Sequence, residues 1–205
     1  MGFKRTKNPD KSSNGLNTPE IDPSNVDIDK ETFLKAINNL DVVRAEKCKR
    51  SLKCFIQEFW GVISDDPLVW NWHLDYLCNE LEKVARRVAR REKKKHDLII
   101  NVPPGTTKTT TVSIMFPAWC WINWPWMKFI TGSHGATLSL ESAEKSRDVI
   151  RSEKFEKYFP YLQVRRDKNK KSNFMIQEHV YDRNGDYKGT KDRGNRYSTS
   201  VGGAT

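Results

Sequence analysis

The segment from Asp97 to Trp119 contains the residue types of a phosphate-binding loop. Its sequence, DLIINVPPGTTKTTTVSIMFPAW, starts with a short apolar run, passes two prolines and Gly105, and continues with Lys108 and Thr109. In a Walker A element, backbone N–H groups and a helix N-terminus bind phosphate oxygens, a lysine reaches the outer phosphates, and a Ser or Thr hydroxyl binds magnesium. Lys108 and Thr109 match the last two roles, so the pattern predicts a nucleotide-binding loop.

The loop departs from the strict pattern GxxxxGK[ST]. Thr107 stands where the second glycine belongs, and no glycine begins the spacing. We expect the backbone of Thr107 to avoid the conformations that only glycine adopts, with Gly105 absorbing the strain of the turn. An ordinary lysine at the start of a helix is the alternative interpretation of Lys108.

Alternating strands and helices would position this loop. Apolar residues at 98–102 predict a buried strand that enters the loop, and residues 109–120 predict the helix that leaves it. A second strand is expected at 127–134 and a further helix at 136–150. This order predicts an α/β fold with a parallel sheet and crossover helices. Ligands of such sheets bind at the carboxyl ends of the strands, so the loop and the TGSHG turn after the second strand should lie near each other.

The flanking regions suggest three parts in all. Residues 1–29 are polar and predict a flexible arm, and residues 30–96 predict a helical lead-in segment in which Asp41 caps a second helix and a further helix covers about 69–91. Residues 97–205 would form a partial P-loop ATPase domain, with short strands at 174–177, 179–181 and 197–201 and a hairpin turn at DRNGD.

Composition limits the partners and the compartment. The 205 residues carry a net charge of +10, which is compatible with nucleic acid or an anionic membrane. The apolar stretch at 112–130 is interrupted by Pro117 and Pro125, so a buried helix, a turn and a strand explain it better than a membrane span. The four cysteines lack CxxC spacing, which argues against structural zinc and a disulfide framework.

Three further groups of polar residues have both a functional and a structural interpretation. Basic runs at 86–95 and 165–171 could contact a DNA backbone, although such runs are commonly solvated faces or helix C-termini. His73 could stack on or hydrogen-bond a nucleobase, or could be an ordinary helix histidine. Asp65 and Asp66 precede Pro67 and indicate a solvated turn rather than a pair of catalytic carboxylates.

With these motifs in order, the chain is similar to the N-terminal part of a tailed-phage terminase large subunit, the ATPase that packages DNA into procapsids. The resemblance covers about residues 55–205. It rests on EFW and VWNWH, LIINVPPGTTKTT, FPAWCW, MKFITGSH with LSLESAEKSRDVIRS, and STSVGGAT. Members of that family continue into a Walker B strand, a coupling motif and usually a nuclease domain. No apolar run ending in paired carboxylates follows the loop here, so we expect a truncated family protein that binds nucleotide but hydrolyses little by itself.

The resemblance implies roles for individual residues. Lys108 would contact the β- and γ-phosphates of ATP, Thr109 would bind Mg²⁺, and His73 lies near an adenine-contacting element. Many relatives have arginine at the position of Gly105, so the charge of that arginine would have to come from Arg147, from Arg151 or from a neighbouring subunit. The residues expected to bind ATP in the loop are Pro104, Gly105, Thr106, Thr107, Lys108, Thr109 and Thr110.

The same resemblance implies partners and a location. Double-stranded DNA, a terminase small subunit and further copies of the chain on a procapsid portal would be the partners, with no membrane involved. The protein would act in the host cytoplasm and transiently on the procapsid. Two alternatives remain from the residues themselves: another P-loop NTPase such as a helicase-like ATPase, or a non-catalytic basic DNA-binding module in which GTTKTT is a mere turn.

Overall fold

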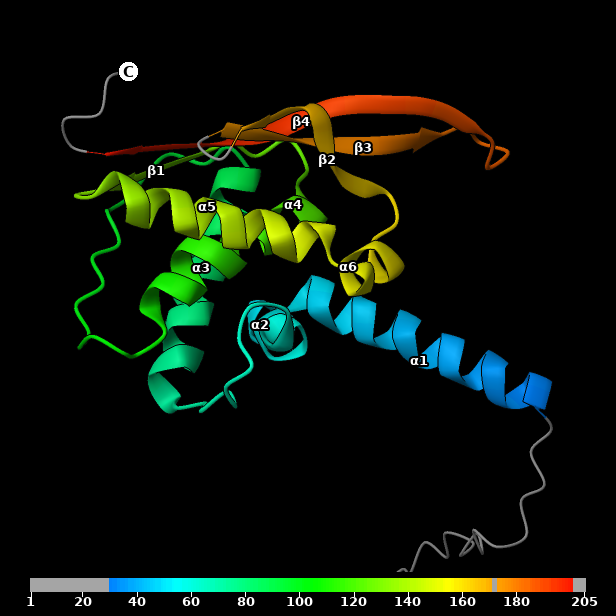
Figure 1. Cartoon of the computed structure of the whole chain (residues 1–205), viewed down its shortest axis with the longest axis horizontal. Helices are drawn as coiled ribbons and strands as arrows, with labels where there is room; N and C mark the ends of the chain where they lie inside the picture. Colours follow the sequence, from blue (N-terminus) through cyan, green and yellow to red (C-terminus); the bar gives the residue numbers. More distant parts are fainter. Residues whose placement is uncertain (1–29, 171–172, 201–205) are drawn as a thin grey trace, which may run out of the picture.

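The computed structural model describes residues 30–170 and 173–200, which form two layers (Figure 1). A four-stranded sheet is one layer, and the helices lie on one side of it, so the chain is mixed α/β.

The arm expected at 1–29 and the end of the strand expected at 197–201 lie outside the described residues. The helical elements are α1 Lys30–Arg50, α2 Leu52–Phe59, the 3₁₀ turn η2 Trp60–Val62, α3 Trp72–Ala89, the π-helix η3 Thr110–Met115, α4 Phe116–Asn123, α5 Ala136–Arg151 and α6 Glu153–Tyr158. The strands are β1 Phe129–Ser133, β2 Leu162–Lys170, β3 Asn173–Tyr181 and β4 Tyr187–Ser200.

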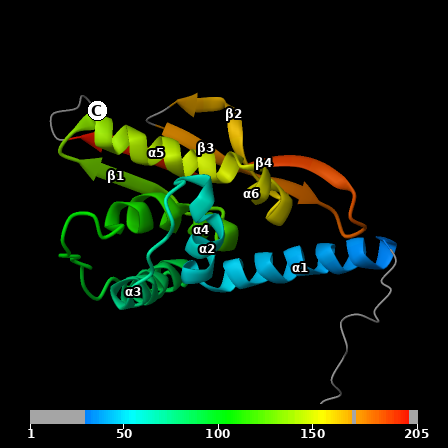
Figure 2. The same cartoon turned by 60° about the horizontal axis from the view of Figure 1, so that its bottom comes forward.

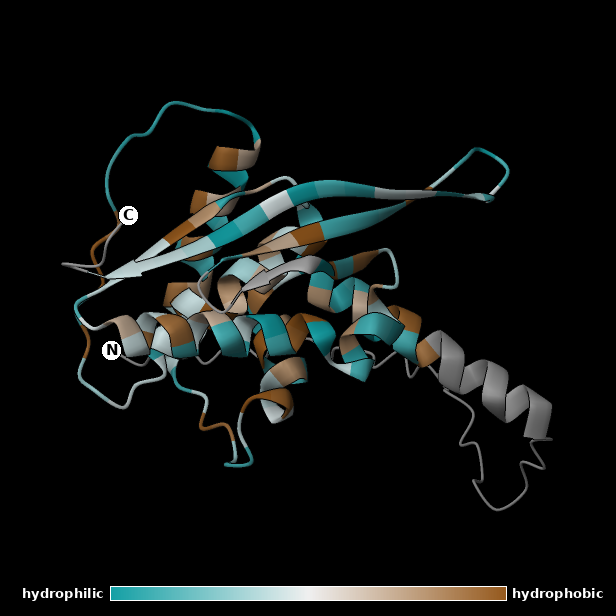
Figure 3. Ribbon diagram, turned by 45° about the horizontal axis from the view of Figure 1, so that its top comes forward, coloured by the Kyte–Doolittle hydropathy of each residue, from teal (hydrophilic) through white to brown (hydrophobic). Residues whose placement is uncertain are grey.

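The sheet is mixed rather than parallel, which corrects the expectation from the sequence. Its strand order is β1-β4-β3-β2; β1 and β4 run parallel, whereas β4, β3 and β2 are antiparallel neighbours. The predicted DRNGD turn explains the antiparallel pairing of β3 and β4, because a turn that short can join only antiparallel strands. Within it, the N–H of Asp182 donates to the carbonyl of Asp186 at 2.9 Å. The hairpin of β3 and β4 extends past the helices, and its outer part is hydrophilic (Figure 3).

The strand expected at 98–102 is absent from the described sheet. Residues 97–103 are irregular, and the side chain of Ile99 is 87% exposed. A buried parallel strand needs a neighbour for its backbone N–H and C=O groups, and the described sheet offers no such pairing to this segment. Leu98, Ile99 and Ile100 instead face a groove on α3, so the loop is entered from an extended segment along a helix.

The N-terminal helices also differ from the expectation in one respect. Helix α1 continues through Asp41, which pairs with Lys157 of α6 at 2.5 Å instead of capping a second helix. The chain breaks ten residues later at Ser51, whose hydroxyl accepts a hydrogen bond from the N–H of Cys54 and caps α2. Only the C-terminal part of α1 packs on the body, and the rest projects away from it (Figure 2).

The helix and strand around residues 112–130 agree with the prediction. Helices η3 and α4, a turn and β1 occupy this stretch, and no helix of the described part is long and apolar enough to cross a membrane. Trp119 and Trp121 are fully buried there, and their indole N–H groups donate to the carbonyls of Cys48 and Met127 at 3.0 and 2.8 Å. Both large rings therefore enter the core with their polar atoms satisfied.

A close backbone approach fixes β4 beside the turn that leads into β1. The N–H of Gly194 donates to the carbonyl of Pro125 at 2.7 Å, and a Cβ at position 194 would lie 1.9 Å from the carbonyl oxygen of Met127. Glycine is thus required by contact with a neighbouring backbone. This contact places the start of β1 against β4.

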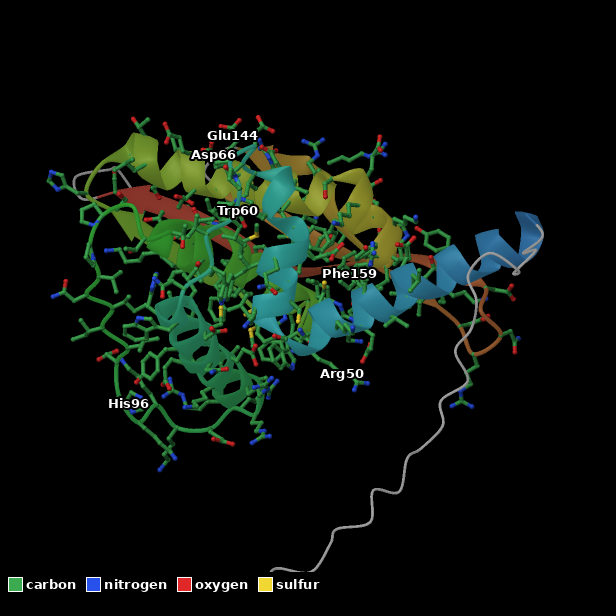
Figure 4. The ribbon with its side chains drawn as sticks, turned by 90° about the horizontal axis from the view of Figure 1, so that it is seen from below. Arg50, Trp60, Asp66, His96, Glu144 and Phe159 are labelled. Atoms are coloured by element: carbon green, nitrogen blue, oxygen red, sulfur yellow. The ribbon has the colours of Figure 1, made fainter. Side chains whose placement is uncertain are left out.

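The Asp65–Asp66 turn is a structural turn, as the sequence indicated. The indole N–H of Trp60 donates to the carbonyl of Asp66 at 2.7 Å, and both residues lie together on one side of the helical layer (Figure 4). Asp65, Asp66 and Pro67 are exposed. No carboxylate pair arises in this turn.

Glu82 should contribute strongly to stability, since its buried carboxylate accepts the N–H of the buried residue Leu52 at 2.8 Å and also pairs with Arg86 at 2.7 Å. Glu82→Ala leaves that N–H without its partner, and we expect unfolding free energy to fall by about 2 kcal/mol in urea titrations. Glu46→Ala is the matched control, because Glu46 forms the same i,i+4 pair with Arg50 on the surface. It should cost about 0.5 kcal/mol or less; equal losses in the two variants would contradict the role of Glu82.

Candidate phosphate-binding site

The loop at 103–109 makes two turns that use left-handed backbone. Gly105 has φ +80°, and Thr107 has φ +57°. The expectation that Thr107 would avoid such a conformation is therefore wrong. The N–H of Thr111 donates to the carbonyl of Thr107 at 2.9 Å, so this left-handed residue accepts the first hydrogen bond of the helix that follows. A β-branched residue in this region is strained by about 1–2 kcal/mol.

Side-chain hydroxyls stabilise the loop from within. Thr106 Oγ1 donates to the carbonyl of Pro103, and Thr107 Oγ1 donates to the carbonyl of Thr106, both at 2.7 Å. Because the bond from Thr111 is the first of the helix, the N–H groups of Lys108, Thr109 and Thr110 have no helical acceptor. Such N–H groups at a helix N-terminus attract anions.

Lys108 brings a positive charge to the same place. Its ammonium folds back over the loop and lies 3.4 Å from the carbonyl of Val102, the residue from which the chain enters the loop. Residues 103–110 surround a hollow of about 550 Å³. The hollow therefore combines an ammonium, free backbone donors and two hydroxyl-bearing turns, a combination suited to several phosphate oxygens.

The carboxyl end of β1 lies next to this loop, as the sequence predicted. A second cavity of about 330 Å³ is lined by Thr109 and Thr110, by the end of β1 at Thr131, Gly132 and Ser133, and by Ser113 of η3. Helix α5 closes it with residues that sequence reasoning did not single out: Leu138, Ser139, Glu141, Ser142 and Lys145. Their helical spacing after the TGSHG turn could have predicted that they share one face of the helix beside the loop.

His73 is brought to the loop, from the first turn of α3. Its Nε2 lies 3.5 Å from the carbonyl of Thr106. A groove of about 300 Å³ opens beside it between α3 and residues 98–102. Trp72 and Tyr76 line the groove and are largely exposed, with Trp72 at 75%. Flat aromatic side chains at the mouth of a groove suit a planar ligand.

Arg147 lies farther along α5 than the residues that line the cavity. Its guanidinium is mostly buried and lies 3.5 Å from Glu144 and 4.0 Å from Asp148 of the same helix. Arg151, at the end of α5, is exposed. The role of either arginine as the charge that replaces a loop arginine stays a prediction.

The residues present are compatible with Mg²⁺ only as a nucleotide-bound ion. No group of three His, Cys, Asp or Glu side chains in the described ranges could hold a metal by itself. Magnesium is commonly held by one or two protein oxygens together with substrate phosphates and water. The exposed hydroxyl of Thr109 faces a cavity that the carboxylate of Glu141 also lines, which provides such oxygens.

No family model matches the chain, and no curated protein or solved structure matches it significantly.

Substitutions at the two left-handed positions should change stability in opposite directions. A Cβ at Gly105 would meet no atom within 4 Å, so Gly105→Ala costs only backbone strain and should destabilise the protein by about 1–2 kcal/mol. Thr107→Gly removes strain and should leave stability unchanged or raise it by up to about 1 kcal/mol, since glycine's flexibility in the unfolded chain offsets part of the gain. Urea unfolding measures both. A loss of more than about 1 kcal/mol in Thr107→Gly would contradict the strain at this position.

Proposed function

We propose that this chain binds ATP with Mg²⁺ through the loop at 104–110. One observation carries the proposal: the loop turns through left-handed Gly105 and Thr107 into a helix whose first N–H groups are free, with the Lys108 ammonium folded over it. This combination has the parts by which Walker A loops bind phosphates, even though a threonine replaces the second glycine.

Each loop residue has a distinct task in this proposal. The N–H groups after Gly105 bind the inner phosphate oxygens, and Lys108 exchanges the carbonyl of Val102 for the outer phosphates. Thr109 contributes its hydroxyl to the magnesium shell. The metal ion neutralises phosphate charge when bound, and catalysis of phosphoryl transfer is largely positioning and electrostatic stabilisation of that charge. Glu141 and Lys145 face the adjoining cavity and would contact its polar contents.

The groove beside His73 would hold the nucleobase. It opens next to the loop at Thr106, and Trp72 and Tyr76 present exposed rings there. Aromatic side chains stack on bases with about 1–3 kcal/mol per base. His73 would then lie between the base groove and the phosphate hollow and contact both.

The larger assignment is to the ATPase part of a phage DNA-packaging motor that couples ATP hydrolysis to translocation of double-stranded DNA into a procapsid. The order of the motifs and the net charge of +10 support it. Double-stranded DNA, a terminase small subunit and further copies of the chain on a portal are the proposed partners, in the host cytoplasm and on the procapsid. A helicase-like ATPase would share the loop and differ in its other motifs.

A basic segment at 86–95 supports contact with DNA. It carries seven cationic residues, of which Arg86, Arg90 and Lys94 have acidic partners at Glu82, Glu92 and Asp97. The segment begins in the last turn of α3, an 18-residue helix about 27 Å long, whose other end contacts the loop. Because Arg86 and Arg87 lie in the last turn of α3 and His73 contacts the loop from its first turn, a duplex and a nucleotide could bind at the same time.

Lys108→Ala should lower the affinity for MgATP about tenfold to a hundredfold, the range expected when a charge-assisted hydrogen bond is lost. Isothermal titration calorimetry measures it. Lys128→Ala is the control, because Lys128 is an exposed lysine at the opposite end of β1 from the cavity, and it should change affinity less than twofold. Unchanged affinity in Lys108→Ala would refute the loop assignment. DNA binding that falls steeply with salt but ignores ATP and Mg²⁺ would favour a basic DNA-binding module instead.

Trp72→Ala should separate base binding from phosphate binding. We expect about tenfold weaker binding of ATP, from the loss of one stacking contact, and no more than twofold weaker binding of inorganic tripolyphosphate. Trp126→Ala is the matched control, since Trp126 is also exposed but lies in the turn before β1. Equal losses for ATP and tripolyphosphate in Trp72→Ala would exclude the groove as the base site.

A further inference from the structure

Arg196 of β4 is a fully buried arginine with an unusual environment. Its side chain is 0% exposed, and it lies on the face of β4 that the helices cover, with Gly194 and Ser198 as its buried neighbours on that face. Buried guanidinium groups are normally paired with carboxylates. Among the residues with described side chains, Arg196 forms no ion pair, and burial lowers its pKa to about 10.

The guanidinium does form one hydrogen bond. Its Nη1 donates to the backbone carbonyl of Ser113, in the π-helix η3 that follows the phosphate loop. That carbonyl lacks its usual α-helical donor, because the residue four positions later is Pro117, which has no N–H. In the same turn the N–H of Phe116 donates to Thr111, five residues back, as a π-helix requires. Arg196 thus supplies from the sheet the hydrogen bond that the proline removes from the helix.

The position of Ser113 connects this contact with the site. Ser113 lines the same cavity as Thr109 and Thr110, one turn earlier on the helix. Any shift of η3 at Ser113 would move the hydroxyl and N–H groups of these two threonines. The contact also joins the phosphate-side helix directly to the central strand that lies between β1 and β3.

Stability alone explains the arginine poorly. Among the described residues, its Nε and Nη2 find no hydrogen-bond partner, and the buried hydroxyls of Ser146 and Ser198 find none either. A buried cation with a single backbone contact loses its hydration and recovers little of that loss, so such groups are weak stabilisers. Incompletely satisfied buried polar groups are instead found where a particular geometry is needed.

We propose that Arg196 is a positioning residue for the phosphate-binding loop: by donating to Ser113, it fixes the π-helical turn that presents Thr109 and Thr110 to the nucleotide. The inference rests on the proposed ATP site. It makes β4 part of that site without contact between Arg196 and the ligand. It also accounts for Pro117 within the helix, since the proline removes the i+4 donor of this carbonyl and Arg196 supplies a donor from the sheet.

A double-mutant cycle tests the proposal. Arg196→Met should weaken MgATP binding about tenfold, and Pro117→Ala should restore most of it, because an alanine at position 117 would return an N–H to the carbonyl of Ser113. Hydrogen exchange at 110–116 should be faster in Arg196→Met and slow again in the double variant. Ser198→Ala is the control on the same face of β4, and it should alter affinity less than twofold because its hydroxyl has no partner.

The outcomes separate this inference from the ATP assignment. If Arg196→Met bound MgATP as tightly as the wild type, with unchanged exchange, the positioning role would be refuted. The positioning role would also be refuted if adding Pro117→Ala to Arg196→Met restored neither the MgATP affinity nor the slow hydrogen exchange at 110–116. If Arg196→Met did not fold, recovery of folding in the double variant would support the shared role, and its failure would overturn it. A wild-type chain that bound no nucleotide would refute the ATP site, and exchange at 110–116 would still decide whether Arg196 holds η3.

Discussion

Helix α4, together with Ile114 and Met115 of the turn before it, is apolar on all sides and therefore has to lie in the middle of the protein. Its residues from Pro117 to Ile122 are buried without interruption, as are Ile114 and Met115. A helix of this kind cannot leave one face in water, so other elements must cover every side of it. Helices α1 and α2 cover one side, with the carbonyl of Cys48 accepting from Trp119, while α5 and the sheet cover another, where the rings of Trp121 and Phe174 meet edge to face. The loop at the start of this helix is held in place by that packing.

The packing of this helix leaves a few backbone groups strained or without their helical hydrogen bond. A strained threonine starts the helix, and a proline interrupts its hydrogen bonds four residues after Ser113. Strain and irregular helical turns persist where the surrounding structure determines them strongly, and they concentrate at binding sites. Here the buried aromatic core around α4 holds the strained turn in place. A loop held in this way would need little rearrangement to bind phosphates as proposed, and a preorganised site binds more tightly.

Local patterns predicted what depends on local chemistry. The amphipathic spacing of α3 and α5, the strand β1, the DRNGD hairpin and the closeness of the loop to the end of β1 were all foreseen. Strand pairing was not, because the partner of β1 is β4, whose paired residues lie 67 positions later in the chain (Phe129 with Arg196), and the segment at 98–102 has the pattern of a strand whether or not a neighbour exists. The single helix α1 was divided at Asp41 because a capping residue and an ion-pairing residue look alike in sequence. Of the proposed site, the sequence singled out the loop and His73 but not Arg196, since the role proposed for Arg196 depends on which face of β4 meets the helices.

The most direct test of the account is to observe which backbone amides meet the nucleotide. In two-dimensional ¹⁵N–¹H spectra of the chain, addition of MgATP should shift the amides of residues 105–110 most strongly, with smaller changes at His73 and at residues 131–133. This is the result that phosphate binding by the free N–H groups of the loop predicts. Shifts confined to the basic segment at 86–95, with the loop amides unmoved, would contradict it.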